Sequence, residues 1–222
     1  MKAILIGATG ATGSELLHLL LADNTISEVV ALVRRALLIQ HPKLRTEVIN
    51  FDEEQTWQHL VTGGVAFSCL GTTLKAAGSK EAQYKVDYTY QYSFARAAKE
   101  NGVPKFLLVS AGMANPKSMF FYARMKGGLE ASIQMLDFEN LTIFRPGLLS
   151  RPQTDRTGEK VSESILSFFN RIGLLKKQAP LPVNKLAQLM LVCAKQNKTG
   201  EQIIEPAGIL EAVKGLMELR SA

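Results

Sequence analysis

A tyrosine and a lysine stand four residues apart in the stretch FFYARMKGGLE, residues 120–130. If this stretch is helical, one turn separates Tyr122 from Lys126, and both side chains project from the same face. A free phenol titrates near pH 10, so a tyrosine that exchanges protons near neutrality needs a neighbouring cation to lower its pKa. Two interpretations are open for the pair alone: a catalytic phenol and ammonium, or a coincidence of helical spacing.

Three glycines stand in ILIGATGATGSELL, between an aliphatic run and a helical pattern. Their G-x-x-G-x-x-G spacing suits a tight turn, a backbone that approaches a pyrophosphate closely, and close packing of helix on strand. The N-terminus of the following helix offers free N–H groups and the positive end of its dipole to phosphate. The pattern predicts a dinucleotide-binding loop, with a purely structural glycine turn as the alternative. The expected cofactor contacts here are Gly7, Thr9, Gly10, Ala11, Thr12 and Gly13.

The end of the second apolar run, ALVRRALL, bears on which nucleotide is bound. An NAD site places an Asp or Glu there to accept hydrogen bonds from the ribose 2′-OH. This chain has Arg34 and Arg35 instead, which are multidentate donors suited to a 2′-phosphate. We therefore predict NADP rather than NAD, with Arg34 as the stronger candidate. The alternative is two exposed arginines on a loop.

Short aliphatic runs alternate with helical patterns along the chain. Strands are expected at KAILIGA, EVVALVRR, RTEVINFD, GGVAFSCLG, KFLLVSA, NLTIFRPG and EQIIEP. Helices are expected at SELLHLLLAD and at about residues 79–100, 118–137, 161–173, 182–196 and 207–220. Nearly continuous aliphatic strands between helices are typical of a parallel sheet covered on both faces.

We therefore predict a single α/β domain with a doubly wound parallel sheet, the NAD(P)-binding Rossmann fold. Residues 1–147 are expected to form the dinucleotide-binding core. Residues 148–222 are expected to form mainly a small C-terminal substrate lobe over the carboxyl ends of the strands, together with the last strand and helix.

Composition limits the remaining possibilities. The 222 residues are 46% hydrophobic and 21% charged, which excludes wholesale disorder. The formal charge of +6 comes from scattered cations without a long basic tract, so we expect no nucleic-acid partner. The longest apolar runs are too short or too interrupted to span a bilayer, so no membrane association is expected. No cationic leader or cleavage site follows Met1, which predicts a cytoplasmic location.

The histidines and cysteines do not form a metal-binding pattern. His18, His41 and His59 have no partners at ligand spacing, and Cys69 and Cys193 are interpreted as buried thiols in a reducing compartment. We predict no metal site.

With the glycine loop and Tyr122-x-x-x-Lys126, the sequence resembles the short-chain dehydrogenase/reductase superfamily. The stretches GATGATG, ALVRR, CLGTTLKAAGS, VDYTY, FLLVSAGMA, YARMKGGLE and FRPGLLS resemble its atypical branch, around the human Tat-interacting-protein oxidoreductase and its bacterial relatives. This resemblance covers about residues 2–150. It implies that Tyr122 is the general acid/base and that Lys126 holds the nicotinamide ribose and lowers the pKa of Tyr122. It also implies that Ser110 orients the substrate carbonyl.

The resemblance implies further cofactor contacts. Leu70, Gly71, Thr72 and Thr73 would lie along the cofactor, although an ordinary strand-end turn explains them too. Asp52 would lie near the adenine amino group, or on a solvated acidic loop. Pro146 in FRPG would border the nicotinamide, or form a structural Pro-Gly turn. Superfamily members often relay protons through an Asn of the long central helix, but residues 79–100 contain none, so that relay is missing or is performed by water.

Together these features predict an NADP-dependent oxidoreductase that transfers hydride between nicotinamide and a small-molecule carbonyl or alcohol, as a monomer or homodimer. The alternative is an NADP(H)-binding redox sensor or interaction protein with little turnover. The complete set Ser110, Tyr122 and Lys126 favours the enzyme, because a sensor has no physical need for it. A third option is an epimerase or dehydratase, but the 75 residues from 148 to 222 leave little room for a sugar-nucleotide lobe.

Overall fold

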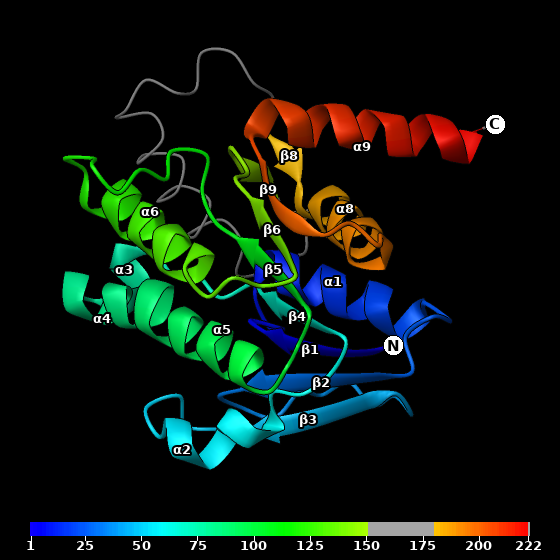
Figure 1. Ribbon diagram of the computed structural model, residues 1–222, viewed down its shortest axis with the longest axis horizontal. Coiled ribbons are helices and arrows are strands. Elements are labelled where there is room, and N and C mark those ends of the chain that lie inside the picture. The colour runs from blue at the N-terminus through cyan, green and yellow to red at the C-terminus, as the bar shows by residue number, and fades with distance from the viewer. Residues whose placement is uncertain (151–179, 222) are drawn as a thin grey trace.

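One parallel sheet of seven strands forms the centre of the computed structural model, which describes residues 1–150 and 180–221 (Figure 1). Its strand order is β3-β2-β1-β4-β5-β6-β9. The strands are β1 (Lys2–Ile6), β2 (Glu28–Val33), β3 (Leu44–Val48), β4 (Val65–Ser68), β5 (Lys105–Val109), β6 (Asn140–Phe144) and β9 (Gly200–Ile204). The direction of winding reverses between β1 and β4, and ligands of open α/β sheets bind at the carboxyl ends of the strands beside such a reversal. The predicted doubly wound Rossmann fold is confirmed.

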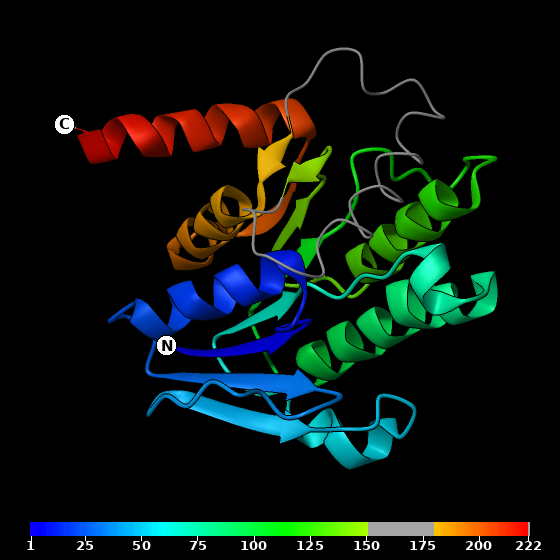
Figure 2. The same ribbon diagram turned by 180° about the vertical axis from the view of Figure 1, so that it is seen from behind.

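Helices cover both faces of this sheet. The helices are α1 (Ala11–Ala22), α2 (Glu54–Trp57), α3 (Leu74–Ala77), α4 (Lys80–Tyr84), α5 (Tyr90–Glu100), α6 (Phe121–Gln134), α8 (Val183–Lys195) and α9 (Pro206–Ser221). Figures 1 and 2 show α1 and α8 on one face and α5 and α6 on the other. Each face has its own apolar core, one centred on α1 and α8 and the other on α5 and α6. Because both faces are covered, the central strands are aliphatic at nearly every position.

The long central helix differs in detail from the continuous helix expected at 79–100. A π-helical segment, η2 (Lys85–Thr89), separates α4 from α5. A π turn holds one residue more than an α turn, and such turns occur frequently at functional sites. The next helix, α6, is shorter than the expected 118–137, and a 3₁₀ turn, η1 (Gln58–Leu60), follows α2.

The C-terminal part of the chain contributes directly to the core. Strand β9 pairs in parallel with β6, and α8 packs against α1. A separate two-stranded pair joins β7 (Leu149–Ser150) to β8 (Leu181–Pro182). The expected helix at 161–173 lies outside the described residues, so the division into a core and a substrate lobe stays a prediction.

Candidate active site

The turn between β1 and α1 is built so tightly that two of its glycines cannot be replaced without strain. Gly7 has a φ of +83°, and a Cβ atom there would lie 2.4 Å from the carbonyl carbon and oxygen of Cys69. A Cβ atom at Gly13 would lie 2.1 Å from the carbonyl oxygen of Gly7. A Cβ atom at Gly10 would meet that oxygen at 3.2 Å, a much milder contact. Packing within the protein therefore explains Gly7 and Gly13 but demands much less at Gly10.

The N-terminus of α1 fits a phosphate group. Gly10 is its N-cap and supplies no side-chain cap, and no acidic residue stands in the first turn. The first N–H groups of an α-helix have no intrahelical partner, so here they are available to an anion at the positive end of the dipole. Thr9 is exposed beside this turn, Ala11 is half-buried, and Thr12 is buried.

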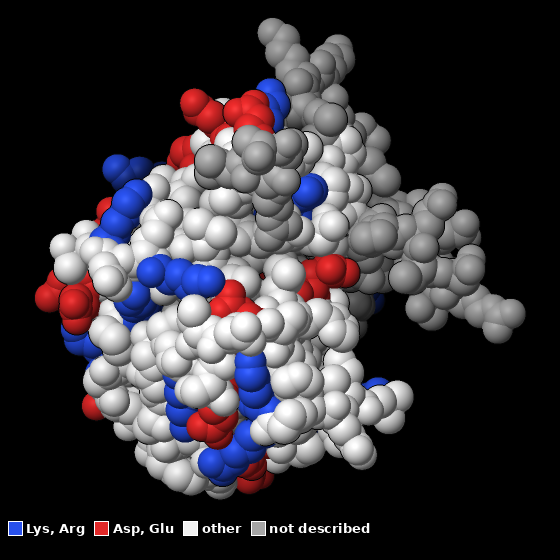
Figure 3. Space-filling view, turned by 90° about the vertical axis from the view of Figure 1, so that its right-hand side faces the viewer, with Lys and Arg blue, Asp and Glu red and all other residues white. Residues whose placement is uncertain are grey.

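The two residues predicted to choose the nucleotide lie on the surface immediately after β2. Arg34 and Arg35 are both exposed. On the face shown in Figure 3, lysine and arginine side chains are interspersed with acidic ones. Asp52, the predicted adenine contact, accepts hydrogen bonds from Lys85 Nζ and Tyr90 Oη, each at 2.8 Å. Both hydrogen bonds lower the pKa of Asp52, and the one from Lys85 has the larger effect.

The turn after β4 is held by the central helix rather than by itself. The backbone N–H of Thr72 donates to Asp87 Oδ2 at 3.0 Å, and Gln83 Nε2 donates to the Thr72 carbonyl at 3.3 Å. Gly71 is exposed, and the Thr73 hydroxyl accepts from Ala76 N as the N-cap of α3. Leu70 is half-buried and packs against the core on the α5 and α6 side of the sheet. Side chains of the central helix thus hold the backbone of this turn in place, beside the β1–β4 reversal.

Tyr122 and Lys126 lie one turn apart on α6, as their spacing predicted. Lys126 is only 1% exposed, and its Nζ donates to the Val109 carbonyl at 3.4 Å. Burial lowers the pKa of the Lys126 ammonium, while the negative charges of Asp87 and, to a smaller extent, Glu130 oppose that change. The lysine is therefore a buried cation next to two carboxylates.

The expectation that Lys126 lowers the pKa of Tyr122 is wrong for the chain alone. Burial, together with the negative charge of Asp87, raises the pKa of the half-buried Tyr122 phenol above its ordinary value. The physical reason is that removing the phenol from water disfavours the charged phenolate, and the carboxylate of Asp87 disfavours it further. Tyr122 is accordingly held in its protonated form near neutral pH.

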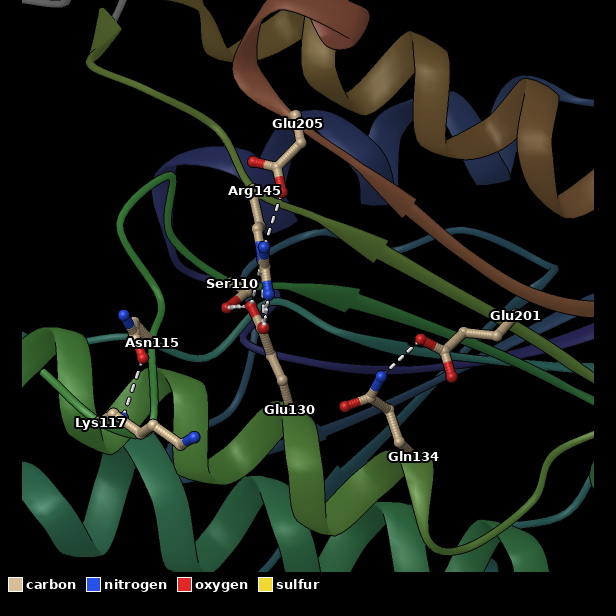
Figure 4. A network of polar contacts seen from close by, with 8 residues as sticks. All are labelled: Ser110, Asn115, Lys117, Glu130, Gln134, Arg145, Glu201 and Glu205. Atoms are coloured by element: carbon tan, nitrogen blue, oxygen red, sulfur yellow. Dashed lines mark hydrogen bonds and ion pairs between the residues drawn. The ribbon is translucent and has the colours of Figure 1, made fainter.

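Ser110 lies at the end of β5 and belongs to a buried polar network (Figure 4). Its hydroxyl donates to the carboxylate of Glu130, which is 2% exposed and forms an ion pair of 2.6 Å with Arg145. Arg145 also pairs with Glu205 at 2.6 Å, so the ends of β6 and β9 are joined through this guanidinium. The neighbouring Pro146 is buried, and its carbonyl accepts from Gly112 N. The hydroxyl hydrogen of Ser110 is thus already engaged inside the protein.

Two acidic residues of the site are missing from the sequence-based set of site residues. Glu130 stands four residues after Lys126, so a third polar group on one helical face was the available signal. Asp87 stands in VDYTY, within the central helix, and is 1% exposed. Burial raises the pKa of Asp87 to about 6, against the attraction of Lys126 and the hydrogen bond from Thr72. Periodicity alone did not mark it, because a π turn changes which residues face inward.

Comparisons with known proteins identify the family to which this fold belongs. A family model described as NAD(P)H-binding matches residues 7–171. The chain belongs to this NAD(P)H-binding family. Its relatives include "Protein FMP52, mitochondrial" of Eremothecium gossypii, 34% identical over 96% of this chain and 98% of the relative. The protein of the same name in Candida albicans is 30% identical over 90% of this chain and 91% of the relative.

Solved structures share the fold at low identity. The oxidoreductase ylbE of Lactococcus lactis matches with a TM-score of 0.60 and 19% identity, covering 98% of this chain and 97% of that one. A short-chain dehydrogenase of Burkholderia cenocepacia in complex with NADP gives 0.65 and 17%, covering 99% and 94%. The Bordetella bronchiseptica enzyme WbmG in complex with NAD gives 0.67 and 14%, covering 100% and 79%. This chain therefore has an NAD(P)-binding, oxidoreductase-like fold, as the superfamily resemblance predicted. The resemblance to the atypical branch around the Tat-interacting-protein oxidoreductase stays a prediction.

The cytoplasmic expectation is contradicted by the relatives. The FMP52 proteins of Eremothecium gossypii, Candida albicans and Saccharomyces cerevisiae are all named mitochondrial. The expectation rested on the residues near Met1 alone, and the names of these relatives overturn it. Within residues 1–150 and 180–221, no helix is long and apolar enough to cross a membrane.

Proposed function

We propose that the protein is an NADP-dependent oxidoreductase of the short-chain dehydrogenase/reductase type, acting on a small-molecule carbonyl or alcohol. The observation that carries the proposal is that three features lie at or beside the carboxyl ends of central strands, near the β1–β4 reversal. These are the uncapped glycine turn, the Tyr122–Lys126 pair on α6, and Ser110 at the end of β5. Two of them are joined, because Lys126 Nζ donates to the carbonyl of Val109, the last residue of β5. Ligands of open α/β sheets bind at such a reversal.

The chain offers donors for each part of the dinucleotide. Backbone N–H groups at Ala11 to Gly13 would hold the pyrophosphate, and Gly10 would let it approach the backbone, since Gly10 N itself donates to the Gly7 carbonyl. Arg34 with Arg35 would hold a 2′-phosphate. Lys126 would hold the nicotinamide ribose. When bound, the cofactor supplies or accepts the hydride.

Tyr122 would handle the proton. In carbonyl reduction, its hydroxyl donates a proton to the substrate oxygen as that oxygen gains charge, and the Lys126 ammonium stabilises the phenolate that remains. The raised pKa of Tyr122 keeps this proton in place near neutrality, which suits the reductive direction. The Ser110 hydroxyl must turn from Glu130 toward the substrate before it can donate to the carbonyl.

One observation favours the second candidate, an NADP(H)-binding sensor or interaction protein with little turnover. In this structure the Ser110 hydroxyl hydrogen is held by Glu130. A protein that only binds the nucleotide tolerates this feature.

The first test is calorimetric titration of NADPH and NADH into the wild-type chain and into Arg34→Asp. We expect wild type to prefer NADPH by at least about tenfold, equivalent to about 1.4 kcal/mol, and Arg34→Asp to lose that preference. If wild type bound neither nucleotide, both the enzyme and the sensor would be excluded. If the NADPH/NADH ratio were unchanged in Arg34→Asp, the assignment of the 2′-phosphate site would be wrong.

A screen of aldehydes and ketones with NADPH then separates the enzyme from the sensor. We expect turnover in wild type and a loss of at least about a hundredfold in kcat for Tyr122→Phe, because general acid catalysis typically contributes that much. Binding of NADPH to Tyr122→Phe should persist, which serves as the control. Tight binding without turnover of any carbonyl in the screen would favour the sensor.

A further inference from the structure

Asp87 stands out as a buried acid that neither the glycine turn nor the Tyr122–Lys126 pair accounts for. It lies in the π-helical segment η2, and its backbone carbonyl accepts from Gln91 Nε2 at 3.0 Å. Gln91 Oε1 accepts in turn from Ser68 Oγ at 2.8 Å, which ties the segment to the end of β4. The π turn is therefore fixed at the crevice where the proposed cofactor would lie.

The groups that face the Asp87 carboxylate come from two other elements. From the turn after β4, Thr72 N donates to Oδ2 at 3.0 Å. Helix α6 packs against η2, and both Asp87 and Lys126 are only 1% exposed. Across this contact Lys126 attracts the carboxylate, and the negative charge of the carboxylate acts on Tyr122. Glu130 is the further charge that acts on Lys126. Asp87 thus links the turn after β4 to the pair on α6.

Of the two carboxylates near Lys126, Asp87 is the one available to balance its charge. Glu130 forms a 2.6 Å ion pair with Arg145 and also accepts from Ser110. Asp87 exerts the stronger attraction on the ammonium. A buried ammonium without a nearby anion loses its proton instead of bearing the cost of desolvation. The charge of Lys126 therefore depends on Asp87 more than on Glu130.

We propose that Asp87 is a positioning residue of the Tyr122–Lys126 pair, whose carboxylate accepts from Thr72 N and keeps the buried Lys126 protonated. Its importance for a reaction rests on the proposed function, whereas the electrostatic coupling itself rests on the burial of both side chains, each 1% exposed, on η2 and α6, which pack together. Because a charged Lys126 is what stabilises a Tyr122 phenolate, Asp87 acts on catalysis through the lysine and need not touch substrate.

The direct test measures the protonation of Lys126 by NMR, using protein labelled with ¹³C at lysine Cε. Asp87→Asn removes the charge but keeps the size and an oxygen that can accept from Thr72 N. The matched control is Asp52→Asn, which removes an equal charge from an exposed carboxylate that contacts Lys85 instead. Lys126→Met identifies the resonance. Circular dichroism and thermal unfolding confirm that each variant is folded.

We expect the pKa of Lys126 to fall by at least about one unit in Asp87→Asn, a tenfold change in its proton affinity, and to stay unchanged in Asp52→Asn. An unchanged Lys126 titration in folded Asp87→Asn, or an equal shift in both variants, overturns the proposal. If Asp87→Asn does not fold, the reciprocal measurement decides. Coupling is mutual, so the ¹³Cγ titration of Asp87 must move to higher pH in Lys126→Met. An unmoved Asp87 titration there also overturns the proposal.

This test is independent of the proposed function, because it needs neither cofactor nor turnover. Failure of NADPH to bind would remove the oxidoreductase and leave the Asp87–Lys126 coupling measurable. If carbonyl reduction is found, the pH profile of kcat for Asp87→Asn should lose its alkaline limb at lower pH than wild type. A profile that is only scaled down, without a shift, would indicate a structural role and overturn the positioning role.

Discussion

Gly10 offers the sharpest separation between a phosphate loop and a structural turn. The substitution Gly10→Ala adds one methyl group at the N-cap of α1, where the backbone has a φ of −78° and a ψ of 170°. This conformation is open to alanine, and the new Cβ would meet only the Gly7 carbonyl oxygen at 3.2 Å and the Cys69 carbonyl oxygen at 3.7 Å. The protein itself has little reason to require glycine here.

The expected effect on stability is accordingly small. Alanine is a poorer N-cap than glycine, whereas replacing glycine reduces the entropy of the unfolded chain, so the two effects largely cancel to within about 1 kcal/mol. A pyrophosphate held by the N–H groups of this turn has no room for a methyl group between itself and the backbone. We therefore expect NADPH affinity to fall at least about tenfold, equivalent to about 1.4 kcal/mol.

Gly13→Ala is the matched comparison. Its Cβ would stand 2.1 Å from the Gly7 oxygen and 2.8 Å from the Gly7 carbonyl carbon, both backbone atoms. Overpacking of this kind costs about 1–3 kcal/mol or more, so this variant should lose stability as well as binding. Urea unfolding and calorimetry on both variants measure the two effects. Unchanged NADPH affinity in folded Gly10→Ala would refute the placement of the pyrophosphate at this turn.

Two further predictions concern charged pairs. Glu130→Gln should lower the free energy of unfolding by about 1–3 kcal/mol in urea titration, because Arg145 loses its buried anionic partner and Ser110 is left with a neutral acceptor. A change below about 0.5 kcal/mol would show that this network adds little to the stability of the fold. Asp23→Asn should cost about 0.5–1 kcal/mol at pH 7, a value reduced for solvent screening, because Lys195 Nζ lies 2.8 Å from the Asp23 carboxylate. Contact with Lys195 and Thr25 lowers the pKa of Asp23 from 3.8 to about 2, so this stabilisation is complete above pH 4 and is lost as pH falls toward 2; a difference between variants that stays constant over this range would contradict the ion pair.

The features that could be predicted from the sequence are those that depend on residues close together in the chain. Aliphatic runs buried on both faces, and glycines forced by a close backbone approach, leave a pattern within a few neighbouring residues. The Tyr122–Lys126 face followed from helical spacing in the same way. Hence the sheet, most of its covering helices, and the places of Ser110, Tyr122 and Lys126 in the fold could be predicted without coordinates.

Features that depend on contacts between distant elements could not be found in this way. Asp87 is buried in a π-helical segment and accepts from Thr72 N, and Glu130 pairs with Arg145, the residue that follows β6. Both contacts join residues at least 15 positions apart. The pKa of Tyr122 is raised first by burial of the phenol and then by the negative charge of Asp87, and neither can be read from the spacing of Tyr122 and Lys126.

A final prediction follows from the energetic cost of the buried lysine. An ammonium that is 1% exposed is expensive to desolvate, and an apolar replacement of similar length is often neutral or stabilising. We expect Lys126→Met to change the free energy of unfolding by less than about 1 kcal/mol near pH 5, while it removes turnover with NADPH. The lysine would then be retained for chemistry rather than for stability.

The pH dependence of this variant provides the check. Burial raises the pKa of Asp87 in the folded protein from its ordinary 3.8 to about 6, so the fold favours the protonated form of this group. The contribution of Asp87 to stability therefore falls as the pH rises from about 4 to about 6. Without Lys126 this pKa rises further, so Lys126→Met should lose stability relative to wild type between pH 5 and pH 8. A large loss already present at pH 5, where Asp87 carries a proton, would mean that Lys126 stabilises the fold through its packing and its bond to Val109. In that case the buried cation would give no support to a catalytic site.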